Sequence, residues 1–265
     1  MVGDDCSVCN QSSCLLGVRA GTPIESVVGE LARFPVAHTA AMLLCRYWNR
    51  LVDMPDDRLT KQAFLESVTL AGSDAGGQTR CWAAQVASFL DFMQPIVDGV
   101  AQYMDPDVVG AVLERDYFES VNCSDKIKVQ SWLRVRGPVD PVSYTLPAYL
   151  QAGVISSRVR RRRLAQFRTG SHWLAVEAGR WVVPRLPREE RLCQRCSMAA
   201  VDDEAHMLWE CPALVETRIQ HIDLFRDGTA RVEEFMQQDA AQLASFLQSC
   251  YRVCGAVEGW SAAQS

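Results

Sequence analysis

The chain has 265 residues, of which 48% are hydrophobic and 22% charged, as expected for a globular protein with a sizeable core. No apolar run approaches the roughly 20 residues of a membrane-spanning helix, which argues against a membrane protein. The net charge is −5, yet residues 158–195 contain 11 Arg, no Lys and 3 Glu, so this segment carries +8 and the remainder −13. Such a basic segment indicates a polyanionic partner, and the alternative is a solvated arginine-rich helix face.

We interpret residues 1–23 as a linker. They begin with a polar, acidic stretch, which is unlike a secretory signal. Cys6, Cys9 and Cys14 are spaced C-x2-C-x4-C without an obvious fourth ligand, so their role is open between ordinary thiols and a second zinc site. The chain has 11 cysteines, an odd number, which favours thiols and metal ligands over disulfides. We therefore expect a reducing compartment, either nuclear or cytoplasmic.

Residues 24–155 predict a helical region. One long amphipathic helix is expected to bury an apolar stripe made of Val36, Ala40, Leu43, Leu44, Tyr47, Trp48 and Leu51. Further helices are expected over residues 58–71, around 86–93 and after Asp105-Pro106, with a flexible loop at residues 72–78. Residues 125–136 are apolar and basic, and Trp132 and Leu133 are expected to point inward. Glycine and proline then predict a domain boundary between about residues 137 and 156.

The arginine-rich segment belongs to a predicted region spanning residues 156–225. Arginine binds phosphate oxygens in a bidentate manner, so this segment predicts contacts with nucleic acid. The four consecutive arginines cannot all face one partner on a helix, because they spread around its axis. The predicted nucleic-acid-binding residues are Arg158, Arg160, Arg161, Arg162, Arg163, Arg168, His172 and Arg180.

Three residues near this segment carry separate expectations. His172 has a structural alternative as a capping or hydrogen-bonded histidine. Trp173 is expected in the core, because it adjoins Leu174 and Val176. Residues 181–183 give the only strand signal of the region, directly before the cysteine motif.

The motif that organises the chain is C-x2-C-x9-H-x4-C, formed by Cys193, Cys196, His206 and Cys211. Thiolate and imidazole groups at this spacing predict one tetrahedral zinc ion. Four protein ligands leave no open position, so the predicted zinc ion is structural and no catalytic residues are assigned. The alternatives are a redox cysteine pair, which no βαβ pattern supports, and chance clustering of cysteines.

His206 is expected on a short helix capped by Asp202 or Asp203. Cys211 follows five residues later, about 140° further around an ideal helix, so the two side chains would not reach one ion. We therefore expect the helix to loosen near Glu210, before Pro212.

Residues 226–265 predict a C-terminal helical tail, preceded by a helix with Val215, Ile219 and Ile222 on one face. Leu243, Phe246, Leu247, Cys250 and Cys254 follow helical spacing in the tail. Cys250 and Cys254 are expected to be small core residues.

Residues 163–218 resemble the region that follows the polymerase domain in LINE-type (non-LTR) retrotransposon reverse transcriptases. The matching positions are Phe167, Arg168, Thr169, Gly170, His172, Gly179, Arg180, Cys193, Cys196, Asp203, Glu204, His206, Cys211 and Pro212. Residues 47–64 are more loosely similar to the helical segment after the polymerase palm, which suggests a thumb-like role for residues 24–155. The chain lacks the palm aspartates and any endonuclease motif, so polymerase activity does not carry over. The resemblance implies a C-terminal piece of such a polyprotein, or a domesticated copy, that binds element RNA or target DNA.

Together these features predict a mainly α protein: a helical bundle with a small CCHC zinc-knuckle subdomain and a C-terminal helix. The predicted function is nucleic-acid binding without enzymatic activity of its own. The alternative is a zinc-stabilised protein-interaction module, in which the arginines contact an acidic protein.

Overall fold

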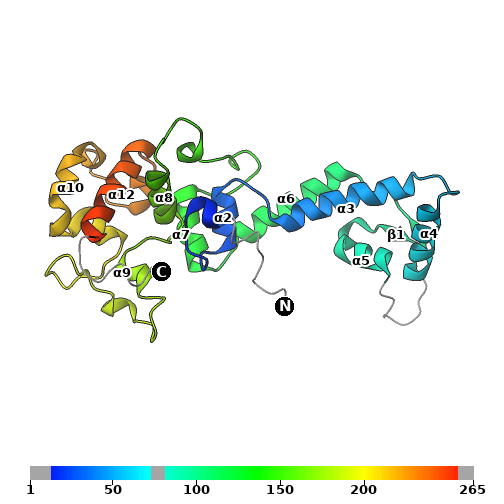
Figure 1. Cartoon of the computed structure of the whole chain (residues 1–265), viewed down its shortest axis with the longest axis horizontal. Coiled ribbons are helices and arrows are strands. Elements are labelled where there is room, and N and C mark those ends of the chain that lie inside the picture. Colours follow the sequence, from blue (N-terminus) through cyan, green and yellow to red (C-terminus); the bar gives the residue numbers. More distant parts are fainter. Residues whose placement is uncertain (1–12, 73–80, 256–265) are drawn as a thin grey trace. The chain divides into compact units, whose positions relative to one another are not determined.

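The computed structural model describes residues 13–72 and 81–255 and is mainly helical, which confirms the predicted fold class (Figure 1). The chain divides into two compact units. Unit 1 comprises residues 1–33 and 121–265, and unit 2 comprises residues 34–120. No helix within the described ranges is long and apolar enough to cross a membrane.

This division differs from the predicted domains, because no unit ends between residues 137 and 156. The described part of the predicted linker, residues 13–23, also contributes to unit 1. Leu16 is buried there, and the Gly17 carbonyl accepts hydrogen bonds from Arg162 and Gln166. Cys6 and Cys9 lie outside the described residues, and Cys14 is an exposed thiol.

Unit 2 contains four helices of eight or more residues within its described part, together with one short hairpin. The helices are α3 (Val36–Val52), α4 (Leu59–Gly72), α5 (Trp82–Phe89) and α6 (Pro106–Asn122), whose last two residues belong to unit 1. A 3-10 turn, η1 (Asp91–Met93), precedes the antiparallel strands β1 (Ile96–Val97) and β2 (Val100–Ala101). Helices α3, α4 and α6 agree with the predicted segments, whereas α5 begins before the predicted segment around residues 86–93 and ends at Phe89. The hairpin was not predicted. Most of the predicted loop at residues 72–78 lies outside the described residues.

The core of unit 2 is aromatic. The Trp48 ring lies 5.0 Å from the Phe64 ring and 5.7 Å from the Trp82 ring, measured between centroids. The buried face of α3 shares Trp48 and Leu51 with the predicted stripe, but its other buried residues are Ala41, Cys45 and Asn49. Val36, Leu43 and Tyr47 are exposed instead. The small residues Ala41 and Cys45 lie on the buried face of α3. A prediction based on the spacing of large apolar residues therefore misses this face.

Unit 1 is built from α2 (Ile24–Glu30), α7 (Ile127–Arg136), α8 (Arg158–Arg168) and α12 (Ala240–Gly255), with α8 packed against α12. Its shorter elements are η2 (Ala148–Leu150), α9 (Ala175–Ala178), η3 (Arg188–Glu190), η4 (His206–Glu210), η5 (Pro212–Leu214), α10 (Val215–Gln220), η6 (Ile222–Phe225) and α11 (Val232–Phe235). Trp132, Trp173, Cys250 and Cys254 are buried, as predicted.

A buried carboxylate joins four elements of unit 1. The side chain of Glu30, at the end of α2, is fully buried and accepts hydrogen bonds from Trp132 Nε1 and Tyr149 Oη, both at 2.8 Å. Its Oε1 atom also lies 2.5 Å from Arg168 Nε. Buried carboxylates require such partners, because desolvation of an unpaired charge is costly. Arg168 is therefore held in the interior of unit 1.

The strand predicted at residues 181–183 does not form. These residues are exposed bends, and Trp181 Nε1 donates to Glu177 Oε1 at 3.0 Å. A strand needs a paired neighbour, and none of the described segments pairs with this one.

Candidate metal centre

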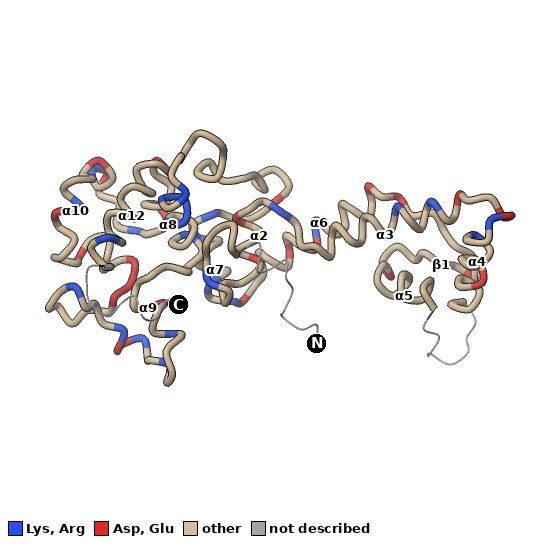
Figure 2. The backbone as a smooth tube through the Cα atoms, viewed as in Figure 1, with Lys and Arg blue, Asp and Glu red and all other residues tan. Residues whose placement is uncertain are grey.

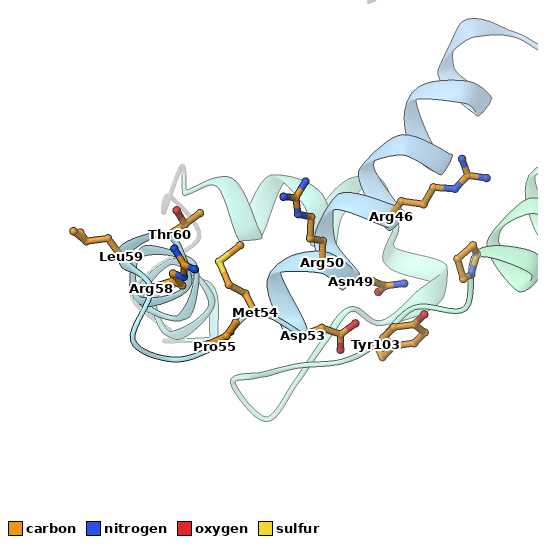
Figure 3. Close-up of a pocket in the computed structure, with 11 residues that line it drawn as sticks. Arg46, Asn49, Arg50, Asp53, Met54, Pro55, Arg58, Leu59, Thr60 and Tyr103 are labelled. Atoms are coloured by element: carbon orange, nitrogen blue, oxygen red, sulfur yellow. The ribbon is translucent and has the colours of Figure 1, made fainter.

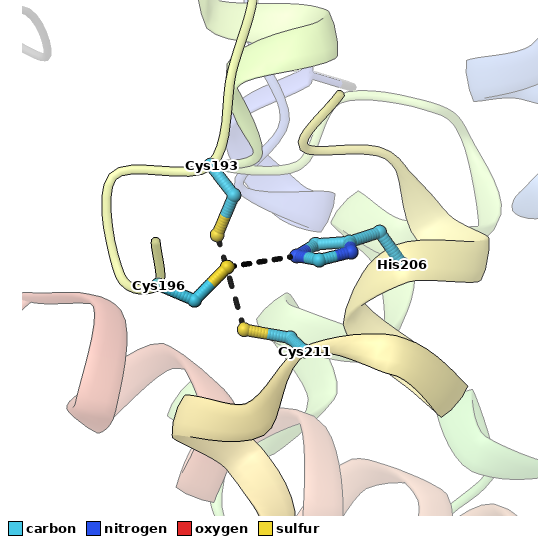
Figure 4. Close-up of side chains that lie close together, drawn as sticks. All are labelled: Cys193, Cys196, His206 and Cys211. Atoms are coloured by element: carbon cyan, nitrogen blue, oxygen red, sulfur yellow. Dashed lines mark hydrogen bonds between the residues drawn. The ribbon is translucent and has the colours of Figure 1, made fainter. Parts of the chain in front are cut away.

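Cys193, Cys196, His206 and Cys211 converge in unit 1 (Figure 4). One ligand atom from each residue lies within 4.8 Å of all the others. The sulfurs of Cys193 and Cys211 lie 3.8 Å apart, and Cys196 Sγ lies 3.5 Å from His206 Nε2. Cys193, His206 and Cys211 are buried, and Cys196 is half-buried. The predicted ligand set therefore forms a group that could hold one metal ion.

A short antiparallel bridge positions the first two cysteines. Leu192 pairs with Val201, and the Cys193 amide donates to the Ala200 carbonyl at 2.8 Å. The chain between these residues forms a tight loop that turns back on itself. A loop of this kind brings two cysteines separated by two residues to one side, as the motif predicts.

A widened helical turn positions His206 and Cys211. Asp203 Oδ1 accepts from the His206 amide at 3.1 Å, so Asp203 is the cap of this turn. The Cys211 amide then donates to the His206 carbonyl at 2.8 Å, five residues back, which defines a π-type turn over His206–Glu210. Because this turn includes one additional residue, residues five apart return to the same side. The predicted loosening of the helix is confirmed.

Two polar groups support the widened turn. Glu210 Oε2 lies 3.3 Å from His206 Nδ1, which leaves Nε2 facing the sulfurs. A carboxylate on the second nitrogen is the common way to orient a metal-binding histidine. Arg218 donates to the Cys211 carbonyl at 2.7 Å and to the Met207 carbonyl at 3.3 Å. Arg218 thereby donates hydrogen bonds to carbonyl groups that would accept from backbone amides in a regular helix.

A buried ion pair lies beside the sulfurs. The guanidinium of Arg195, inside the Cys193–Cys196 loop, pairs with Asp202 and donates to Cys254 Sγ at 3.1 Å. Asp202 Oδ2 also accepts from the Ala175 amide at 2.8 Å, which ties the loop to α9. Asp202 was the other residue predicted to cap the helix of His206. It stabilises the Cys193–Cys196 loop instead.

Burial favours the protonated form of the Cys193 thiol. Desolvation raises the pKa of the Cys193 thiol to about 12, although the Arg195 amide and guanidinium act in the opposite direction. Without a bound cation this thiol keeps its proton at neutral pH. A metal ion must displace that proton to bind the sulfur.

The structure gives most of the eleven arginines of residues 158–195 a partner within the protein. Arg168, Arg180, Arg188 and Arg195 form ion pairs with Glu30, Glu177, Asp203 and Asp202. Arg161, Arg162 and Arg191 donate to backbone carbonyls, and Arg163 bonds Gln166 and stacks on Tyr251. Arg158, Arg160 and Arg185 have no side-chain partner among the described residues.

This placement separates the predicted nucleic-acid-binding residues into three groups. Arg158, Arg160 and Arg162 are exposed on α8, where Figure 2 shows a concentration of basic residues. Arg161, Arg163 and Arg180 are half-buried and bonded internally. Arg168 is committed to Glu30, and His172 is buried with Nε2 at 2.7 Å from Glu204 Oε1. The side chains of Arg168 and His172 therefore lack the exposure that a phosphate contact requires.

Sequence reasoning missed Glu210 as the partner of His206, Arg195 beside the sulfurs and Arg218 on the freed carbonyls. Of these three residues, only Glu210 could have been predicted from the sequence. It lies four residues after His206, which places both on the same face of a helix. Arg195 and Arg218 belong to a sequence with many arginines, and their roles depend on the path of the chain.

Comparisons of the chain with protein-family models, with curated proteins and with solved structures gave no match. The resemblance of residues 163–218 to LINE-type reverse transcriptases therefore stays an expectation.

Proposed function

We propose that unit 1 is a zinc-stabilised nucleic-acid-binding module. The observation that carries this proposal is the convergence of four ligand atoms within 4.8 Å, in the same unit as an arginine-rich helix. Three cysteines and one histidine form a complete tetrahedral shell, which is the composition of structural zinc sites. The proposed role of the ion is to hold the loop at residues 193–200 against the turn at residues 206–211.

Two of the separations between ligand atoms fit zinc. Zinc binds sulfur at about 2.3 Å and nitrogen at about 2.05 Å with tetrahedral angles. These values correspond to separations of about 3.8 Å between two sulfurs and about 3.6 Å between a sulfur and a nitrogen. The structure has 3.8 Å and 3.5 Å at the corresponding pairs.

The surroundings also fit the charge of such a site. Three thiolates and one divalent ion leave a net charge of about −1. The guanidinium of Arg195 lies beside Cys193 and Cys254, where it can offset that charge. Glu210 fixes the histidine so that Nε2 faces the ion.

The proposed contact surface for nucleic acid is the exposed side of α8. Arg158 and Arg160 have no partner among the described side chains, and Arg162 is exposed although its Nε atom bonds the Gly17 carbonyl. Arg158 and Arg162 also line a groove of about 500 Å³, together with Leu15 and Val159. Guanidinium groups on a groove suit the phosphate backbone, which predicts binding that depends little on sequence and strongly on salt.

The test compares two pairs of exposed arginines in the full chain. Arg158→Ala/Arg160→Ala should weaken nucleic-acid binding about tenfold and reduce the salt dependence of the affinity, because fewer counterions are released. Arg226→Ala/Arg231→Ala is the matched control, since both side chains are exposed in the same unit. Equal affinities of the two double variants, or affinity that does not change with salt, would contradict the proposal.

A second candidate is a protein-interaction module, as considered from the sequence. It is favoured by the exposed apolar face of α10 and η6, where Val215, Ile219 and Ile222 are 46%, 57% and 51% exposed. An acidic protein would contact the arginines while an apolar segment covered this face. Binding of oligonucleotides at moderate salt favours the first proposal over this one.

The family resemblance adds a proposed context, in which the chain is the C-terminal piece of a retrotransposon polyprotein or a domesticated copy. In that context we propose no polymerase activity for this chain. Primer extension by the purified protein would contradict that statement.

A further inference from the structure

Unit 2 contains a pocket of about 930 Å³ that the proposed function does not use. It lies between the C-terminal half of α3, the turn before α4 and the segment before α6 (Figure 3). Its charged and aromatic lining residues are Arg46, Arg50, Asp53, Arg58 and Tyr103. All of them belong to unit 2, so the pocket is complete within one unit.

The arginines of this pocket lie in a unit that is acidic overall. Residues 34–120 contain 6 Arg and Lys against 12 Asp and Glu, which gives a net charge of −6. Five of these cations are described, and two of them have partners. Lys61 donates to the carbonyls of Leu51 and Val52, and Arg115 pairs with Asp116.

The other three described cations all line the pocket. Arg46, Arg50 and Arg58 are exposed and form no ion pair or side-chain hydrogen bond with a described residue. Arg46 and Arg50 lie one turn apart on α3, so they share one face. Three unpaired guanidinium groups around one hollow of an acidic unit indicate an anionic ligand with more than one charge.

Two further side chains restrict the chemistry of that ligand. Tyr103 is 60% exposed and presents an aromatic ring on which a base could stack. The Asp53 carboxylate also lines the pocket and can only accept hydrogen bonds from the ligand. It would repel a simple polyanion, but it suits a ligand that carries hydroxyl donors between its charges. Phosphates, bases and ribose hydroxyls together are the groups of RNA.

We propose that this pocket binds a segment of single-stranded RNA. Arg46, Arg50 and Arg58 contact phosphates, and a base stacks on Tyr103. Asp53 accepts a hydrogen bond from a ribose 2′-hydroxyl, which gives a preference for RNA over DNA. This site is separate from the arginines of α8 and does not depend on the proposed zinc ion.

The first test measures the affinity of the full chain for a short oligouridine as a function of salt. Arg50→Ala should weaken binding about threefold and lower the salt slope by about 0.7, the value for one phosphate contact on a single strand. Arg115→Ala is the matched control, because it removes an exposed arginine of the same unit outside the pocket. If Arg50→Ala and Arg115→Ala have the same effect, the site is refuted.

The second test separates stacking from general damage. Tyr103→Ala should lose about tenfold in affinity for oligouridine, whereas Tyr103→Phe should keep most of it, because the ring remains. Equal affinities of these two variants would overturn the stacking role.

The third test addresses the preference for RNA. Oligouridine and oligodeoxyuridine differ only in the 2′-hydroxyl, so their affinity ratio reports its recognition. Asp53→Asn should lower that ratio, since a charged acceptor is lost, while the affinity for the deoxy form rises. A gain by the same factor for both oligonucleotides would show that Asp53 acts only through its charge and would overturn the assignment to RNA.

The pocket variants should also be measured in a chain that carries Arg158→Ala/Arg160→Ala. If the α8 surface does not bind nucleic acid, that double change has no effect, and the pocket variants still lower the affinity. If the pocket does not bind RNA, only the α8 change lowers it.

Discussion

The two units have similar secondary structure but stabilise their interiors differently. Unit 2 is centred on an aromatic cluster of Trp48, Phe64 and Trp82, and the buried polar side chains among its described residues are Asn49 and Lys61. Unit 1 buries many more polar groups, including Glu30, Glu177 and Asp202, each paired with a basic side chain. It also contains the four metal-binding candidates.

This difference has an energetic consequence. An aromatic core is stabilised by burial and packing, which depend little on pH or metal ions. Buried charges stabilise a fold only while their partners are in place, because desolvation opposes them. Unit 1 should therefore respond to metal removal and to single charge changes, whereas unit 2 should respond mainly to loss of packed volume.

Removal of the proposed zinc ion should have the largest effect. A chelator should lower the free energy of unfolding of unit 1 by about 5 kcal/mol or more, since structural zinc contributes directly to folding. Hydrogen exchange followed by peptide mass spectrometry should show lost protection around residues 192–218 and retained protection in α3 and α4. Equal loss in both units would mean that they do not fold separately.

Truncation of Trp48 should have the next largest effect, in the opposite unit. Trp48→Ala removes a fully buried indole and should destabilise unit 2 by about 4 kcal/mol. The metal content of the purified protein should stay the same. A variant that unfolds unit 1 to the same extent would contradict the separation of the two cores.

Neutralising Glu30 tests the buried charges of unit 1. Glu30→Gln leaves Arg168 without its counter-charge and should cost about 3 kcal/mol in a denaturant titration. Glu25→Gln is the control, because the Lys126 side chain of that pair is 57% exposed and the expected cost is below about 1 kcal/mol. Similar costs for both variants would show that burial does not strengthen the Glu30–Arg168 pair.

The smallest expected effect is the pH dependence of metal affinity. Because burial raises the pKa of the metal-free Cys193 thiol to about 12, binding releases its proton at any lower pH. The affinity should therefore fall by about tenfold for each unit of decrease in pH from this thiol alone. Competition with a chromophoric chelator at several pH values measures the slope. An affinity independent of pH would contradict thiolate coordination by Cys193.

The sequence predicted the features that depend on local spacing. The helices of unit 2, the burial of Trp132 and Trp173 and the grouping of the four ligand residues followed from periodicity and motif spacing. The widened turn also followed, because an ideal helix would separate His206 from Cys211 by about 140°.

The remaining features depend on contacts between distant segments. Net charge over residues 158–195 did not reveal which arginines are free, because their partners include Gly17 and Glu30, more than 130 residues away. The inner face of α3 was misassigned because Ala41 and Cys45 give a weak apolar signal. Val183 lies next to a proline in an exposed segment, where β-branched residues had suggested a strand.

The most direct test of the account is the zinc content per chain of protein purified without chelators, measured beside Cys196→Ser. We expect one zinc ion in the parent protein and none in the variant. A folded parent protein without zinc would contradict the proposed metal site.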